Sequence, residues 1–141
     1  MKYYIDTCIW LNLFKKEEDV KKNIVYWKIT KDFITKTSKK NNIIVSTIVL
    51  KELEHILGST FPRVKKYLSS SPKCIIVRVT HQDYEKARFL EFQTKSQLSF
   101  YDYLHIAIAM RFNTMLITRD KDMITIGKKY VQIKKPEALL R

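Results

Sequence analysis

Short runs of strand-forming residues alternate with helical segments from one end of the chain to the other. Consecutive parallel strands need a crossover between them, and short apolar strands suit a sheet that is covered on both faces. The alternation therefore predicts an α/β fold with a central, mainly parallel sheet. The chain has 141 residues, and we expect them to form one domain over residues 1–141. The predicted strands are KYYID (2–6), IIV (43–45), CIIVRV (74–79), TMLIT (114–118) and YVQIK (130–134).

Capping residues indicate where several of the intervening helices begin or end. Ser46 can cap a helix that carries Val49 and Leu53, and Gly58 can terminate it. Thr80, followed three residues later by Asp83, has the pattern of a capping box. These signals predict helices after the second and third strands.

Two other segments have a weaker pattern. Val20, Ile24, Trp27 and Ile34 recur at helical spacing, which predicts a helix through the lysine-rich segment that follows the sequence EED. Residues 61–73 read FPRVKKYLSSSPK and contain two of the three prolines. We expect a loop there, with room for a short helix.

Acidic residues follow two of the predicted strands. Asp6 ends the first strand, and Asp120 and Asp122 come directly after TMLIT. Ligands of parallel α/β sheets bind outside the carboxyl ends of the strands. Helices begin at this edge too, so Asp102 in a first turn, and Glu52 in an earlier helix, can also reach it. We therefore expect four acids to converge at one edge of the sheet.

Asp102 has two possible roles, because it opens the apolar stretch SFYDYLHIAIAM (99–110). In the first, Ser99 and Asp102 form a capping box, and the carboxylate also favours the positive end of the helix dipole. In the second, the carboxylate binds a metal at the sheet edge. A carboxylate beside so much apolar surface is costly unless it is paired, capped or bound. Both roles remain open on this stretch alone.

A cluster of carboxylates implies a bound cation. Crowded carboxylates repel one another, and a pocket of low dielectric constant strengthens that repulsion. Oxygen ligands with few histidines suit Mg²⁺ or Mn²⁺. Such an ion can orient a water in line with a phosphodiester and lower the pKa of that water. The acids therefore indicate metal-dependent hydrolysis of a phosphate-containing substrate.

The charge of the chain favours a nucleic-acid partner. Lys and Arg number 27 against 14 Asp and Glu, a formal net charge of +13. Each neutralised phosphate releases counterions, so RNA or DNA is the expected class of partner. Lysines scattered along the chain are also compatible with a solubilising surface. Gly58 and Gly127 are the only glycines, too few for a P-loop or a GxGxxG dinucleotide loop.

Cysteine usage and hydropathy predict a cytoplasmic protein. Cys8 and Cys74 lie far apart and form no CxxC pair, so we expect reduced thiols. Asp6 interrupts the N-terminus, and no apolar run approaches membrane-spanning length. We therefore expect neither a signal peptide nor a membrane helix.

Four segments of the chain, in order, resemble the motifs of the PIN-domain nucleases. The resemblance spans almost the whole chain and implies a three-layer α/β/α sandwich that works as a metal-dependent nuclease. A lone domain of this kind is similar to the VapC toxins of type II toxin–antitoxin pairs. That likeness implies a homodimeric endoribonuclease of tRNA or rRNA that a small antitoxin protein neutralises. The segments are YYIDTCIWL (3–11), STIVLKEL (46–53), LSFYDYLHIAIA (98–109) and LITRDKDM (116–123).

The same resemblance implies roles for individual residues. It assigns the catalytic, metal-binding site to four acids and makes Asp122 a further metal ligand, with Thr118 as an auxiliary group. Substrate choice and partner docking are expected to involve residues 14–42 and 61–73, and Arg63, Lys65 and Lys66 are candidate nucleic-acid contacts. The four acids are Asp6, Glu52, Asp102 and Asp120.

Three other interpretations remain to be compared with this one. The first is a stand-alone PIN nuclease in RNA processing, and the second is a non-catalytic RNA-binding module whose acids serve only as caps. The third follows from Glu52-x-x-His55 and Asp102-x-x-His105, whose spacing occurs in di-iron carboxylate bundles. The predicted strands argue against such a bundle, so we expect His55 and His105 to be packing or phosphate-contact residues.

Overall fold

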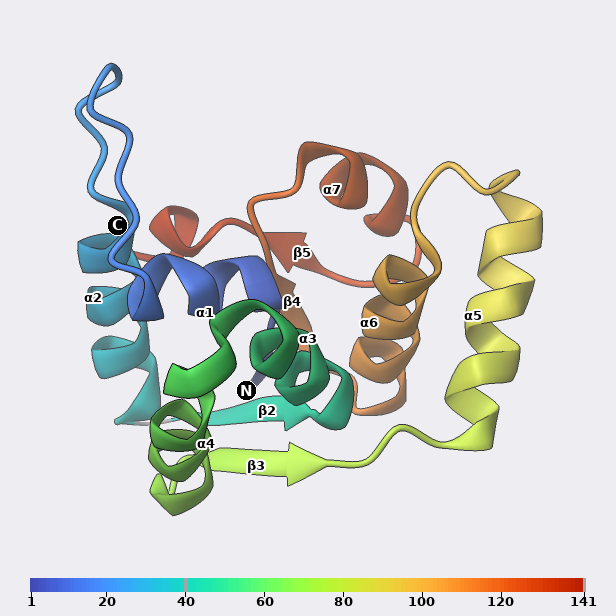
Figure 1. Ribbon diagram of the computed structural model, residues 1–141. Helices are drawn as coiled ribbons and strands as arrows, with labels where there is room; N and C mark the ends of the chain where they lie inside the picture. The colour runs from blue at the N-terminus through green and yellow to red at the C-terminus, as the bar shows by residue number, and fades with distance from the viewer. Residues whose placement is uncertain (40, 141) are drawn as a thin grey trace.

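The computed structural model describes residues 1–39 and 41–140 and contains a five-stranded sheet (Figure 1). The strand order is β3-β2-β1-β4-β5, and every neighbouring pair is parallel. The structure thus confirms the predicted parallel α/β fold. The strands are β1 (Lys2–Ile5), β2 (Asn42–Ser46), β3 (Cys74–Val77), β4 (Met115–Ile117) and β5 (Ile133–Lys134).

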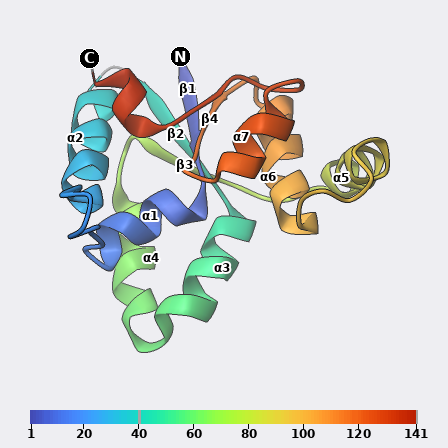
Figure 2. The same cartoon turned by 90° about the horizontal axis from the view of Figure 1, so that it is seen from above.

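Helices cover both faces of the sheet, as a three-layer α/β/α sandwich requires. Figure 2 shows α2 and α4 on one side of the strands and α6 and α7 on the other. Among the described residues, no helix has both the length and the apolar character needed to span a membrane. The helices are α1 (Thr7–Phe14), α2 (Tyr26–Ser38), α3 (Thr47–Leu57), α4 (Phe61–Ser70), α5 (His81–Gln93), α6 (Phe100–Arg111) and α7 (Lys121–Gly127), with short 3₁₀ segments at Gly58–Thr60 and Pro136–Leu139.

The order in which strands are added to the sheet reverses beside the central strand, β1. From β1 the chain moves outward to β2 and β3, and it then crosses back to β4 on the other side of β1. Ile5 of β1 lies opposite Ile117 of β4, and the amide of Asp6 donates to the Ile117 carbonyl at 2.9 Å. Such a reversal is the point at which α/β sheets bind ligands. Asp6 and Thr118, which follow the paired isoleucines, lie at this point.

The predicted caps form as expected. The Ser46 hydroxyl accepts the Val49 amide at 3.2 Å, and Gly58 ends α3 with a positive φ of 55°, which costs glycine little. Thr80 and Asp83 make both bonds of a capping box at the start of α5. Local signals therefore fix where α3 and α5 begin.

Two sequence predictions about helices were right only in part. The helix after EED begins at Tyr26, because the backbones of Asp19 and Ile24 pair at 2.7 and 3.0 Å and close a turn that leaves Val20 in solvent. The expected loop over residues 61–73 is mostly helix α4. Its apolar side chains Phe61, Val64 and Leu68 are buried on one face, and Pro62 lies in the first turn, where its missing N–H costs nothing.

Candidate active site

Asp6 lies at the carboxyl end of β1 and caps α1. Its Oδ1 accepts the Thr7 amide at 2.8 Å, and its Oδ2 accepts the Thr118 hydroxyl at 2.8 Å. The Cys8 thiol also donates to Oδ2, at 3.2 Å. Burial, followed by the charge of Asp6, raises the pKa of Cys8, so the thiol stays protonated and serves as a donor. Asp6 is thus a buried carboxylate held in place by three donors.

Glu52 reaches the same place from the second turn of α3. Its Oε1 accepts the Thr7 hydroxyl at 2.7 Å and lies 2.8 Å from His105 Nε2. His105, on α6, is 1% exposed, and its Nε2 is also 3.6 Å from Asp6 Oδ1. Glu52 and Asp6 are therefore joined through Thr7 and His105, although they come from different elements.

His105 is buried, which fits the packing role among its two predicted roles, and it also makes hydrogen bonds that the prediction did not include. Its Nδ1 is 2.6 Å from the Tyr4 hydroxyl, which in turn is 2.6 Å from the Ser46 hydroxyl. The Asp102-x-x-His105 spacing was the available signal. Thr7, which the sequence reasoning did not single out, carried no comparable signal.

Glu52 and His105 stabilise each other's charged forms. Burial alone raises the pKa of Glu52 and lowers that of His105. The hydrogen bond and the attraction between the two outweigh burial, so the pKa of Glu52 is lowered and that of His105 is raised. Glu52 is consequently an anion at neutral pH.

Asp102 does cap α6, which confirms its capping role. The amide of Ser99 donates to Asp102 Oδ2 at 3.3 Å, and the Asp102 amide donates to Ser99 Oγ at 3.3 Å. Burial, with smaller contributions from the charges of Asp6 and Asp120, raises the pKa of Asp102. Its carboxyl group therefore lies near two other acids, and the capping bond occupies one of its oxygens.

Asp120 and Asp122 lie at the start of α7. Asp120 Oδ1 accepts the amides of Asp122 and Met123 at 2.9 and 3.1 Å, and both aspartates are exposed. The amide of Asp120 donates to the hydroxyl of Thr118 at 3.1 Å. Thr118 is fully buried and donates to Asp6. Thr118 thus joins the ends of β1 and β4.

The donor chemistry of these acids fits a hard divalent cation. Carboxylate and hydroxyl oxygens are the ligands that Mg²⁺ and Mn²⁺ prefer. A cation would offset the burial and the smaller repulsion from Asp6 and Asp120 that together raise the pKa of Asp102. Within residues 1–39 and 41–140, no three His, Cys, Asp or Glu side chains stand close enough together to hold an ion as they are. Binding at this edge therefore requires side-chain rotation.

The candidate nucleic-acid contacts lie elsewhere. Arg63, Lys65 and Lys66 are exposed on α4, on the side opposite its buried face. No hydrogen bond or ion pair found among the described residues links them to the four acids. The structure therefore places them in solvent without joining them to the candidate site.

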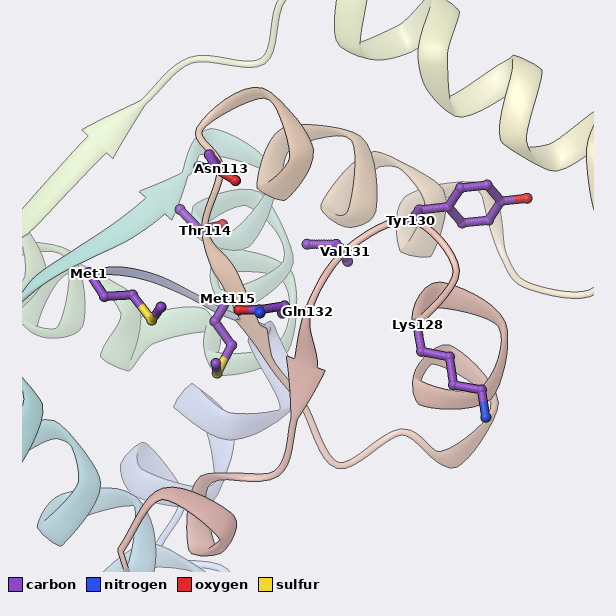
Figure 3. Close-up of a pocket in the computed structure, with 8 residues that line it drawn as sticks. All are labelled: Met1, Asn113, Thr114, Met115, Lys128, Tyr130, Val131 and Gln132. Carbon is purple, nitrogen blue, oxygen red and sulfur yellow. The ribbon is translucent and has the colours of Figure 1, made fainter.

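A pocket of about 590 Å³ lies at the opposite edge of the sheet, beside the residues that lead into β4 (Figure 3). Asn113, Thr114 and Met115 line it together with Met1 and Lys128. None of the residues drawn in Figure 3 is acidic. The pocket is therefore unrelated to the carboxylate site.

A parallel sheet with acids at its switch point defines a class of α/β proteins that bind a ligand at the carboxyl edge. Within this class, the chain belongs to the PIN domain family, whose family model matches residues 3–129. The match includes the four segments that resemble PIN-domain nuclease motifs, and it confirms that resemblance.

Solved structures of similar fold cover nearly the whole chain. VapBC-1 from nontypeable Haemophilus influenzae is 19% identical with a TM-score of 0.72, and the match covers 97% of this chain and 99% of that one. A toxin–antitoxin complex from Klebsiella pneumoniae is 20% identical with a TM-score of 0.67 and coverages of 95% and 97%. The PIN domain endonuclease Utp24 is 17% identical with a TM-score of 0.54 and coverages of 94% and 82%. No curated protein matches the chain.

Proposed function

We propose that the chain is a metal-dependent endoribonuclease that hydrolyses RNA phosphodiester bonds at the carboxyl edge of its sheet. One observation carries the proposal: Thr118 donates to Asp6 at 2.8 Å and accepts the amide of Asp120 at 3.1 Å, while Thr7 bonds to both Asp6 and Glu52. Three acids from three separate elements are thus linked at the carboxyl edge of the sheet. Such an arrangement is unfavourable without a cation and is typical of catalytic sites.

In this proposal Asp6, Glu52, Asp102 and Asp120 hold Mg²⁺ or Mn²⁺, with Asp122 as a further ligand. When bound, such an ion supplies an activated water and neutralises charge on the leaving oxygen. Other residues position the ligands. Thr118 fixes one oxygen of Asp6 at 2.8 Å, and Thr7 and His105 fix Glu52 at 2.7 and 2.8 Å.

We further propose a VapC-like toxin that cleaves tRNA or rRNA as a cytoplasmic homodimer and is neutralised by a small antitoxin. The support is that VapBC-1 and the Klebsiella pneumoniae toxin–antitoxin complex contain chains that match this one over nearly their full length. The net charge of +13 suits a polyanionic substrate. The weaker likeness to the endonuclease Utp24 makes a stand-alone nuclease of RNA processing the second candidate.

The nuclease is tested with labelled total tRNA and rRNA, purified protein and either Mn²⁺, Mg²⁺ or a chelator. Asp102→Asn keeps an oxygen to accept the Ser99 amide but removes the charge. We expect cuts that need metal and that disappear in Asp102→Asn. The control is Asp32→Asn, at an exposed aspartate of α2, which should cut like the wild type. Full activity in Asp102→Asn refutes the assignment, and RNA binding without cleavage under any metal favours the binding module.

The toxin is tested by inducing the chain in growing bacteria. We expect growth to stop with the wild type and with Asp32→Asn, and to continue with Asp102→Asn. Unimpaired growth with an active wild-type nuclease favours the role in RNA processing.

A further inference from the structure

A second pocket, of about 360 Å³, opens directly beside Glu52. It is lined by Lys51, Glu52, His55 and Ile56 of α3 and by Tyr101 of α6. Its volume is in the range of pockets that bind small organic groups. Tyr101 directly precedes Asp102, and Glu52 belongs both to the pocket and to the candidate site. Whatever enters the pocket lies next to Glu52.

The lining combines an aromatic ring with basic side chains. Lys51 Nζ lies 5.7 Å from the centroid of the Tyr101 ring. Ile56 is 47% exposed and adds an apolar side chain to the lining. His55 is exposed as well. A flat ring and an apolar side chain suit the face of a nucleobase, and a lysine suits the adjoining phosphate.

We propose that this pocket binds one nucleobase of single-stranded RNA, beside the phosphodiester that the carboxylates cleave. The base stacks on Tyr101 and contacts Ile56, while Lys51 meets the neighbouring phosphate. The inference rests on the proposed nuclease function and deepens it, since it names the element that fixes the RNA strand relative to the acids. Tyr101 and Lys51 are then positioning residues for the substrate.

The position of the pocket distinguishes it from other exposed aromatic side chains. Phe92, on α5, is 83% exposed, but it does not line the pocket beside Glu52. The pocket of Figure 3 contains Tyr130 and Lys128, yet it lies at the opposite edge of the sheet. The pocket at Glu52 brings an aromatic ring, a basic group and a candidate catalytic acid together.

The test measures binding of a short fluorescent single-stranded RNA by anisotropy, in chelator so that no cleavage occurs. A set of oligonucleotides carries one abasic ribose at each position in turn. With wild-type protein, removing one particular base should weaken binding about tenfold, the usual contribution of a stacked base. In Tyr101→Leu the same abasic change should have no further effect, because the stacking is already lost.

Two further variants sharpen the result. Tyr101→Phe retains the ring and should keep the sensitivity to that base, whereas Lys51→Gln should weaken binding and reduce its salt dependence. Phe92→Leu is the control and should bind like the wild type. Thermal unfolding shows whether Tyr101→Leu is folded. If Tyr101→Leu is unfolded, the test relies on the abasic series with the wild type and Tyr101→Phe, which should show the same dependence on one base.

Two results would refute the base-binding pocket. In the first, the wild type does not bind the RNA, or its affinity does not depend on any single base. In the second, the loss of affinity from Tyr101→Leu and the loss from the abasic ribose are additive. RNA cleavage in Mn²⁺ is measured in parallel, so that failure of the pocket proposal can be told from failure of the nuclease proposal. Coupling between Tyr101 and one base without cleavage supports the pocket and contradicts the nuclease. Cleavage without coupling supports the nuclease and refutes the pocket.

Discussion

His105 joins three elements of the candidate site. It contacts Tyr4 on β1 and Glu52 on α3 while itself belonging to α6. Burial raises the pKa of Tyr4 well above its usual value, so the phenol stays protonated and needs a partner. Loss of the imidazole would leave the Tyr4 hydroxyl and the Glu52 carboxylate each with one bond fewer.

We expect His105→Ala to lower the free energy of unfolding by about 2–4 kcal/mol, from a cavity and unpaired polar groups. Urea unfolding followed by circular dichroism measures the change. His81→Ala is the matched control, because His81 is exposed and pairs with Glu85 at the surface. It should change stability by less than about 0.5 kcal/mol. Equal stability of the two variants would contradict the structural role of His105.

The acids were more predictable than their partners. Asp6 and Asp120 follow strands, so the rule that ligands bind at carboxyl edges located them without coordinates. His105 lies in a helix whose residues from Tyr103 to Ala109 are all buried. Periodicity cannot tell which side of such a helix faces the site. The capping box likewise could not separate the two roles of Asp102, because one carboxyl group can serve both.

Helix α5 is joined to the rest of the fold through α6. Arg111 at the end of α6 donates from Nε and Nη2 to the two oxygens of Asp83 at 2.9 and 3.0 Å. Asp83 is 2% exposed, and its Oδ2 also accepts the Thr80 amide at 2.9 Å in the capping box of α5. One buried carboxylate therefore both starts α5 and docks it against α6.

We expect Arg111→Gln to destabilise the protein by about 2 kcal/mol, because it leaves the buried charge of Asp83 without its partner. Arg111 itself is partly exposed, which keeps the expected loss below that of a fully buried pair. Amide hydrogen exchange should rise in α5 more than in α3. Arg63→Gln, at an exposed arginine of α4, is the control. If α5 keeps its protection in Arg111→Gln, the ion pair does not dock this helix.

Helices were predictable where a cap was present. Ser46, Thr80 and Ser99 each precede a helix in the structure. Helix α4 has no side-chain cap. Its proline and serines are typical of a loop, so burial of its apolar face decides its structure. The start of α2 was misplaced for the opposite reason, because a backbone turn at residues 19–24 interrupts a helical pattern.

The proposed RNA binding should depend on salt, because the chain carries a large positive charge. We expect the change of Lys65 and Lys66 together to Gln to weaken RNA binding and to reduce the log–log salt slope by about 1.4, or 0.7 per phosphate contact on a single strand. Lys128 and Lys129, exposed at the end of α7, form a matched pair. Changing this second pair should alter the slope less. Equal slopes for the two double variants would place the RNA elsewhere than on α4.

The order of elements was enough to predict a parallel sheet, but not the order of its strands. Alternating strands and helices leave little alternative to crossovers. Strand β1 is central, with β2 on one side and β4 on the other. This order depends on which strands pair, and short apolar runs such as IIV and TMLIT do not indicate their pairing partners. The strand order is nevertheless what brings Asp6 beside Thr118 and Asp120.

The most direct measurement of the central claim is Mn²⁺ binding by electron paramagnetic resonance, which reads free ion in solution and needs no RNA. Wild type and Asp32→Asn should bind Mn²⁺ with the same affinity. Asp6→Asn and Asp102→Asn should each bind at least about tenfold more weakly, because each removes a charged oxygen ligand. Equal Mn²⁺ affinity in all four proteins would show that these carboxylates do not form one cation site.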